Sequence, residues 1–113
     1  MNRGEIWLIN LDPTIGAEIR KTRPAIIVND NAVGILPLKI IVPITEWQER
    51  YAIAPWMICI EPDATNGLEK QSAADTFQIR SLSQRRFVSQ LGQLSPESMQ
   101  QITQALTLVL AIK

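Results

Sequence analysis

The sequence predicts a mainly β protein: a small antiparallel β-barrel followed by one C-terminal α-helix. Short apolar runs, alternating or rich in β-branched residues, recur at close intervals through residues 4–91, and turn-prone residues separate them. After Ser95 the spacing of apolar residues changes to that of a helix. With 113 residues, 46% of them hydrophobic and 19% charged, the chain is long enough for one core, and we expect a single domain over residues 1–113.

The first part of the chain holds two predicted strands on either side of a polar loop. Gly4–Leu11 carries apolar side chains on both faces, which is typical of a strand inside a sheet. Asp12 and Pro13 end this strand, and residues 14–22 are too polar to belong to a core. Ala25–Val28 is then a second buried strand, ending at the turn-prone residues 29–31.

Further strands are predicted in the middle of the chain. Leu38–Ile44 is one, and its Pro43 should lie at a sheet edge or a strand end because proline cannot donate to a ladder. Trp56–Ile60 is the next, with its tryptophan expected in the core. Residues 72–82 end in a strand-like tail, and Phe87–Leu91 is a short additional strand.

The C-terminal residues predict one amphipathic helix from Pro96 to about Ala111. Ser95 suits the N-cap, proline suits the first helical position, and Glu97 favours the helix N-terminus. An apolar stripe at helical spacing should pack in the core or against a second copy of the chain. It comprises Met99, Ile102, Leu106, Val109 and Leu110.

Composition restricts the possible functions. The formal net charge is +0, which argues against a sequence-blind binder of polyanions, so any nucleic-acid contact must be local. The chain has no histidine, which removes the usual general base near neutral pH and the commonest zinc ligand. We therefore expect neither zinc nor histidine-triad chemistry, and the sequence indicates no cofactor.

Other features concern the compartment. The single cysteine, Cys59, cannot form an internal disulfide and lies in an apolar run, so it should be a buried, inert thiol. No apolar run approaches the roughly 18 residues that span a bilayer. The N-terminal residues also lack the long apolar core of a signal peptide. We expect a cytoplasmic protein without a membrane partner.

The stretch 12–28, DPTIGAEIRKTRPAIIV, leads a charged loop directly into a β-branched strand. Pro24 fixes its own φ and disfavours the α region for Arg23, so Arg23 should be the last loop residue or the first strand residue. A guanidinium held there is preorganised for a phosphate or a carboxylate. The same residues also fit a surface loop with a structural arginine at a strand entry.

The run at 3–28, RGEIWLINLDPTIGAEIRKTRPAIIV, resembles the start of the MazF/PemK toxins of bacterial toxin–antitoxin pairs. That start reads RG, an acid and IW, then a DPT-x-G-x-E loop, then RP and an apolar strand. The resemblance continues over the whole chain, through VPIT at 42–45, NGL at 66–68, QIRSL at 78–82 and the C-terminal helix. The N-terminal signature is its specific part, because several turn and charge positions agree together.

The resemblance implies a small SH3-like β-barrel with a C-terminal helix that forms a homodimer and cleaves single-stranded RNA at short sequences without a metal. In that reaction the ribose 2′-hydroxyl attacks the adjacent phosphate, leaving a 2′,3′-cyclic phosphate and a 5′-hydroxyl. DNA lacks the 2′-hydroxyl and should be inert. The resemblance also implies a cognate antitoxin that covers the same groove with a disordered tail.

The family's catalytic positions correspond to Glu18, Arg23 and Thr45. Arg23 suits a clamp on the phosphorane oxygens, since a guanidinium presents several fixed donors. Glu18 can accept the 2′-proton, although either Glu18 or Arg23 can be the general base. Thr45 can donate a hydrogen bond to a phosphoryl oxygen. Without the resemblance, Glu18 would be a loop charge paired with Arg20 or Lys21, and Thr45 would cap a turn.

Two positions depart from one branch of the family. That branch has a histidine directly before the loop glutamate, where this chain has Ala17. It also has an acid directly before the glutamine of the closing motif, where this chain has Phe77. A histidine–aspartate version of the chemistry is therefore excluded, and an arginine–threonine version remains.

Further residues are candidates to contact RNA, because they flank the catalytic positions or belong to the family's closing motif. Trp47 could stack on a base, a contact that supplies roughly 1–3 kcal/mol per base, or it could pack against a neighbouring loop. Gln78 could read a base edge or hold the Arg23 loop, whereas Arg80 could be an ordinary ion-pair partner. The full set is Thr14, Arg20, Lys21, Glu46, Trp47, Ser72, Gln78 and Arg80.

Two other functions stay open at this point. The related CcdB toxins share the implied fold but bind DNA gyrase. The intact DPT-x-G-x-E and RP elements favour a ribonuclease, because a gyrase binder has no need of a phosphate clamp in that loop. The missing histidine and acid leave a third hypothesis, an inactive paralogue that binds only RNA or an antitoxin.

Overall fold

The computed structural model describes residues 1–11, 22–34 and 36–113. In this part of the chain it contains seven β-strands, three short 3₁₀ helices and one α-helix. The strands are β1 (Glu5–Asn10), β2 (Thr22–Ile27), β3 (Leu38–Glu46), β4 (Met57–Ile60), β5 (Ser72–Asp75), β6 (Arg80–Ser83) and β7 (Phe87–Gln93). The 3₁₀ helices span Glu49–Ile53, Thr76–Gln78 and Gln84–Arg86, and the α-helix, α1, spans Pro96–Val109.

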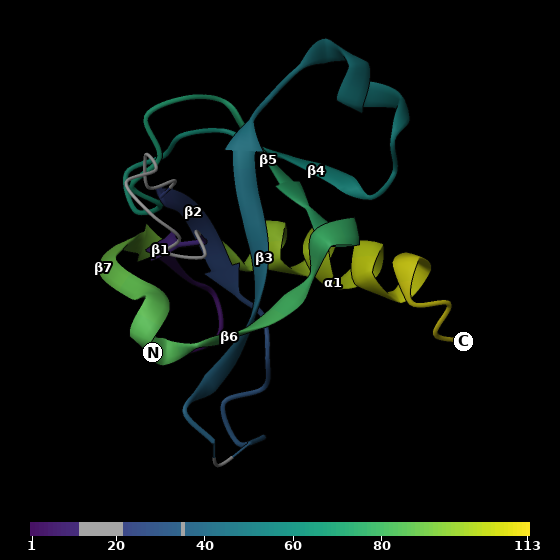
Figure 1. Ribbon diagram of the computed structural model, residues 1–113. Coiled ribbons are helices and arrows are strands. Elements are labelled where there is room, and N and C mark those ends of the chain that lie inside the picture. Colours follow the sequence, from purple (N-terminus) through teal and green to yellow (C-terminus); the bar gives the residue numbers. More distant parts are fainter. Residues whose placement is uncertain (12–21, 35) are drawn as a thin grey trace, which may run out of the picture.

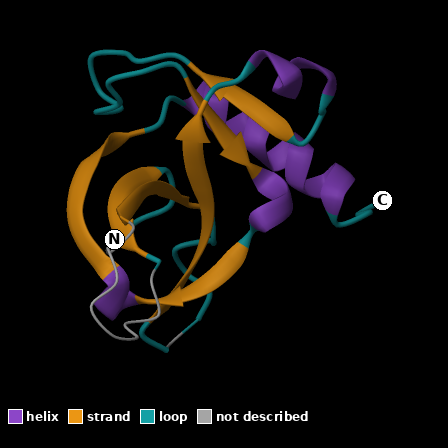
Figure 2. Cartoon of the chain, turned by 45° about the horizontal axis from the view of Figure 1, so that its top comes forward, coloured by secondary structure: helices purple, strands orange, loops and turns teal. Residues whose placement is uncertain are grey.

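The strands form one antiparallel sheet in the order β4-β5-β3-β2-β1-β7, with β6 also paired to β3. The long strand β3 pairs with β2 on one side and with β6 and then β5 on the other (Figure 1). The sheet curls strongly (Figure 2). Within the described residues the edge strands β4 and β7 do not pair with each other, so the barrel is not closed. The predicted mainly β fold with a C-terminal helix is confirmed.

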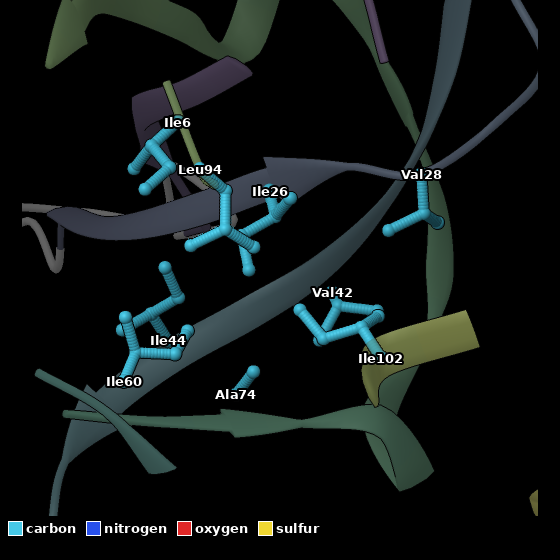
Figure 3. Packing of buried hydrophobic residues seen from close by; sticks show 9 residues of the cluster. All are labelled: Ile6, Ile26, Val28, Val42, Ile44, Ile60, Ala74, Leu94 and Ile102. Carbon is cyan, nitrogen blue, oxygen red and sulfur yellow. The ribbon is translucent and has the colours of Figure 1, made fainter. Parts of the chain in front are cut away.

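The central strands carry two separate hydrophobic clusters, one on each face. Ile6, Ile26 and Val42 point into the larger cluster, where Ile102 of α1 also packs (Figure 3). Residues at the alternate positions build the smaller one: Ile9, Ala25, Ile27 and Ile41, with Leu82. Successive side chains of a strand point to opposite faces of the sheet. Because both sets are apolar here, both faces are buried. The predicted central position of the first strand is confirmed.

The helix begins as the sequence predicts. The side-chain oxygen of Ser95 accepts a hydrogen bond from the Ser98 backbone N–H at 3.2 Å, and proline occupies the first turn. Ile102 and Ala105 are buried, and α1 lies against one side of the sheet beside β4 (Figure 2). Leu110, the last residue of the predicted stripe, is exposed beyond the helix end. No helix in the described part of the chain is long and apolar enough to cross a membrane.

The prediction that Pro43 lies at a sheet edge or a strand end is wrong. β3 continues to Glu46, and Pro43 is buried opposite Ala25 of β2. On the other side of β3, pairing with β6 ends at Ile41 and pairing with β5 begins at Ile44. The proline is tolerated because β3 changes neighbours there, so it interrupts no ladder on that side.

Two predicted core residues near β4 are exposed. Cys59 faces outward, with its Sγ 3.4 Å from the Gln71 side-chain nitrogen and 3.7 Å from a Glu61 oxygen. Partial burial, with the Glu61 carboxylate adding to it, raises the pKa of the Cys59 thiol. Trp56 precedes β4 and is 40% exposed. Both predictions fail because β4 is an edge strand with one face open to solvent.

The strand-like end predicted for residues 72–82 is β6, and the start of the same stretch forms a further strand, β5, that the sequence analysis did not predict. The chain turns between them in the 3₁₀ helix Thr76–Gln78. The buried Thr76 hydroxyl donates to the Trp56 carbonyl oxygen at 2.6 Å, which fixes the turn against the start of β4. This turn brings β5 and β6 to different parts of β3.

Candidate functional site

The structure brings Arg23 and Thr45 together. β2 pairs with β3 through Ala25 and Pro43, and the same antiparallel register continued by two residues sets Arg23 opposite Thr45. The Arg23 Nη1 donates to the Thr45 Oγ1 at 3.3 Å. Arg23 is exposed and extended, as Pro24 predicts, although β2 begins at Thr22, three residues earlier than expected. Among the described residues, no other hydrogen bond engages the guanidinium or the threonine hydroxyl, so both can donate to a ligand.

This pair lies on the border between two clefts, and Arg23, Ile44 and Thr45 line both of them. The large cleft has a volume of about 700 Å³ and the small one about 250 Å³. The large cleft is lined further by Leu8, Thr22, Pro24, Glu46, Gly67, Leu68, Glu69, Lys70, Ser72 and Leu91. The small cleft is lined further by Leu11, Pro43, Tyr51, Asp75 and Gln78.

One wall of the large cleft is a loop organised by the fully buried Asn66. Its side-chain oxygen accepts from the backbone N–H of Leu68 at 3.0 Å, and its side-chain nitrogen donates to the Glu61 carbonyl at 2.8 Å. Asp63 accepts from the backbone N–H groups of Thr65 and Asn66, and these hydrogen bonds lower the pKa of its carboxyl group. The loop therefore holds residues 67–70 in place along the cleft.

Opposite charges lie along the same cleft. The Lys70 ammonium is 3.8 Å from a Glu46 carboxylate oxygen, and both side chains are exposed. Ser72 lies opposite Glu46 in the β3–β5 register, and its hydroxyl donates to the Lys70 carbonyl at 2.8 Å. An exposed pair such as Glu46 and Lys70 contributes little to stability, so either group is free to exchange its partner for a ligand.

The small cleft contains a carboxylate that the sequence analysis missed. Asp75 accepts from the Phe77 backbone N–H at 3.2 Å and from the Gln78 side-chain nitrogen at 2.7 Å. Tyr51, also missed, lines the same cleft and lies in the 3₁₀ helix Glu49–Ile53, which follows β3. The sequence signal for Asp75 was its place directly before a turn and three residues before the glutamine.

Other predicted site residues lie elsewhere. Trp47 lines neither cleft within the described chain, and its ring packs edge-on against Tyr51 with centroids 5.8 Å apart. This packing is the alternative that the sequence left open. Arg80 is exposed on β6 opposite Ile41 and lines neither cleft. Four predicted residues lie outside the described residues: Thr14, Glu18, Arg20 and Lys21.

Comparison with known proteins gives consistent matches over the whole chain. Residues 2–110 match the family model described as PemK-like, MazF-like toxin of type II toxin-antitoxin system. The chain is 30% identical to the endoribonuclease MazF9 of Mycobacterium tuberculosis, over 96% of this chain and 94% of that protein.

Solved structures show the same fold. A mycobacterial endoribonuclease in complex with its cognate antitoxin superposes with a TM-score of 0.79 at 21% identity, covering 100% of this chain and 97% of the other. A MazE-MazF structure from Deinococcus radiodurans gives a TM-score of 0.80 at 22% identity, with the same two coverages.

Proposed function

The chain belongs to the family of PemK-like and MazF-like toxins of type II toxin–antitoxin systems, and we propose that it is an endoribonuclease toxin that cleaves single-stranded RNA at short sequences. The observation that carries the proposal is the pair Arg23 and Thr45, hydrogen-bonded at 3.3 Å on the border of two clefts. The relatives are named endoribonucleases, which favours this function over gyrase binding and over an inactive paralogue. We also propose that residues 1–113 form a single toxin domain.

The proposed reaction is an attack of the ribose 2′-oxygen on the adjacent phosphorus, with loss of the 5′-oxygen of the next nucleotide. The products are a 2′,3′-cyclic phosphate and a 5′-hydroxyl. Negative charge builds on the non-bridging oxygens, where the free N–H groups of Arg23 and the Thr45 hydroxyl can both donate. Glu18 or Arg23 takes the 2′-proton, and one proton is returned to the leaving 5′-oxygen.

We propose that the RNA strand runs along the large cleft. Glu46 and Ser72 line it, and Lys70 offers a cation once its contact with Glu46 is exchanged for a phosphate. With a formal net charge of +0, binding rests on a few local phosphate contacts, so its dependence on salt is modest. Thr14, Arg20, Lys21, Trp47, Gln78 and Arg80 are also proposed RNA contacts.

We propose that a cognate antitoxin neutralises the toxin by covering these clefts. A relative with the same fold is described in complex with its cognate antitoxin, and MazE-MazF structures have been solved for another. Both ligands would then compete for Arg23. We also propose that the protein acts in the cytoplasm, since its proposed substrate, messenger RNA, is available there.

We further propose that the toxin is a homodimer. Leu36, Leu38 and Leu110 are 66%, 44% and 52% exposed, which leaves apolar surface for a second copy to cover. Light scattering at micromolar concentration should give twice the mass of the chain. A monomer under those conditions would contradict the proposal.

The test of the proposed function is cleavage of a long single-stranded RNA by the purified protein in EDTA, beside its DNA counterpart. We expect cuts at short sequences in RNA only, with 2′,3′-cyclic phosphate ends. Thr45→Ala should slow cleavage about a hundredfold, because it removes one donor to the developing charge. Thr107→Ala, which removes an exposed helix hydroxyl, should leave the rate unchanged. Intact RNA after incubation with folded wild-type protein would refute the function.

A further inference from the structure

We propose that Asp75 determines base specificity: its carboxylate fixes the side-chain amide of Gln78 so that the amide oxygen is offered to a base in the small cleft, which favours adenine or cytosine over uracil there. This inference rests on the proposed ribonuclease function. Asp75 does not act on the reacting atoms in this proposal. It is a positioning residue for Gln78.

The direction of the contact between the two side chains is set by chemistry. An ionised carboxylate has no proton to donate, so the group that Gln78 turns towards Asp75 must be its nitrogen, at 2.7 Å. The amide oxygen then points away from Asp75. Gln78 is exposed and lines the small cleft, so this oxygen is available to a ligand.

The Asp75 carboxylate is itself held from a second side. Its other oxygen accepts from the Phe77 backbone N–H at 3.2 Å, as the cap of the 3₁₀ helix Thr76–Gln78. Since one oxygen is engaged by the backbone and the other by Gln78, the orientation of the glutamine amide is tied to the backbone. Such double anchoring is what a preorganised recognition group requires.

The small cleft is suited to one base next to the reacting phosphate. Its volume of about 250 Å³ is below the range of sites for drug-sized ligands, which suits a single ring system. Arg23 and Thr45 line this cleft as well as the large one, so a base bound here belongs to a nucleotide beside the phosphate they hold. Tyr51 adds an aromatic wall, and the Arg50 guanidinium carbon lies over its ring, 5.4 Å from the centroid.

The donor and acceptor pattern then distinguishes the bases. Adenine carries an amino group at its 6-position and cytosine one at its 4-position, and both donate hydrogen bonds. Uracil carries a carbonyl oxygen at the equivalent place, which the Gln78 oxygen would repel. One position of the cleavage sequence should therefore favour adenine or cytosine.

Asp75→Asn should reverse this preference. The Phe77 N–H still needs an acceptor, so the oxygen of the new side-chain amide accepts this hydrogen bond. The nitrogen of the same amide then faces Gln78. The Gln78 amide must then turn over to accept that hydrogen bond, which leaves its nitrogen facing the cleft. We expect the ratio of cleavage rates for adenine or cytosine against uracil at this position to change by about fivefold or more.

The double variant Asp75→Asn/Gln78→Glu provides a matched control. It exchanges the amide and the carboxylate between the two positions, so the local net charge and the hydrogen bond are kept. An acceptor oxygen again faces the cleft. This variant should restore the preference for adenine or cytosine, which a purely structural role of Asp75 would not predict.

The experiment is cleavage of a randomised single-stranded RNA pool by the wild type and both variants, with the cut sites sequenced and each fold checked by circular dichroism. A shift at one position in Asp75→Asn, reversed in the double variant, supports the inference. If the wild type cleaves RNA and all three proteins show the same base preference, whatever their rates, this inference is wrong and the proposed function stands. No cleavage by the wild type overturns the proposed function, and this inference with it.

Discussion

Arg23→Ala should lower the rate of RNA cleavage by about a thousandfold or more while leaving the fold intact. Arg23 is exposed near the start of β2 and packs in neither hydrophobic cluster, so its truncation costs little stability. Among the described residues, Arg23 is the cation that lines both clefts. Its side chain is held by the hydrogen bond to Thr45. The loss should therefore fall on the transition state, where charge builds on the phosphate.

Two further variants separate the position of Arg23 from its charge. Arg85→Ala removes an exposed arginine of the 3₁₀ helix Gln84–Arg86 that lines neither cleft, and it should keep nearly the wild-type rate. Arg23→Lys keeps the charge but loses the planar set of donors, so it should recover only a small part of the activity. Rates are measured under single-turnover conditions on one RNA. Equal losses in Arg23→Ala and Arg85→Ala would show that only overall charge matters.

Gly67→Ala should destabilise the protein by roughly 2–4 kcal/mol, the sum of a strained backbone and an overpacked contact. Gly67 has a φ of +71°, in the region that favours glycine. A Cβ there would lie 2.7 Å from the Leu91 carbonyl carbon and closer still to its oxygen. Because Leu91 is in β7, neither backbone can move without displacing the loop that walls the large cleft. Cleavage should therefore weaken together with stability.

Gly34→Ala is the matched control for this substitution. Gly34 also has a positive φ, +93°, but a Cβ there would meet no described atom within 4 Å. Gly34→Ala should lower the free energy of unfolding by about 1 kcal/mol, from the strained backbone alone. Urea unfolding of both variants measures the difference, which reports the clash with Leu91. Equal free energies of unfolding would show that the loop yields to the added methyl group.

The elements that depend on neighbours in sequence could be predicted from the sequence. Ser95 caps the helix through the backbone N–H three residues later, and Pro24 extends Arg23 through the peptide bond that they share. Apolar residues on both faces of the first strand predicted that it lies inside the sheet, and β1 does have both faces buried. The charge and turn signature of residues 3–28 indicated the toxin family, which the comparisons confirm.

Exposure in the sheet could not be predicted, because it depends on which strands have neighbours. Cys59 and Pro43 both lie in apolar runs, yet Cys59 is exposed on the edge strand β4 and Pro43 is buried in the middle of β3. The order of strands in a sheet is set by long-range pairing, and a local pattern carries no information about it. The same limit hid β5, the strand at the start of residues 72–82.

The fold class, the helix, the family and the candidates Arg23 and Thr45 could all be predicted, since each rests on local conformation or on a motif. That these two side chains meet depends on tertiary pairing, because the register of β2 against β3 brings together residues 22 positions apart. Tertiary pairing also places the local Asp75–Gln78 contact in the same cleft as Arg23. Antiparallel pairing brings residues that are far apart in the sequence into contact. The core that buries both faces of the central strands fixes the register of that pairing.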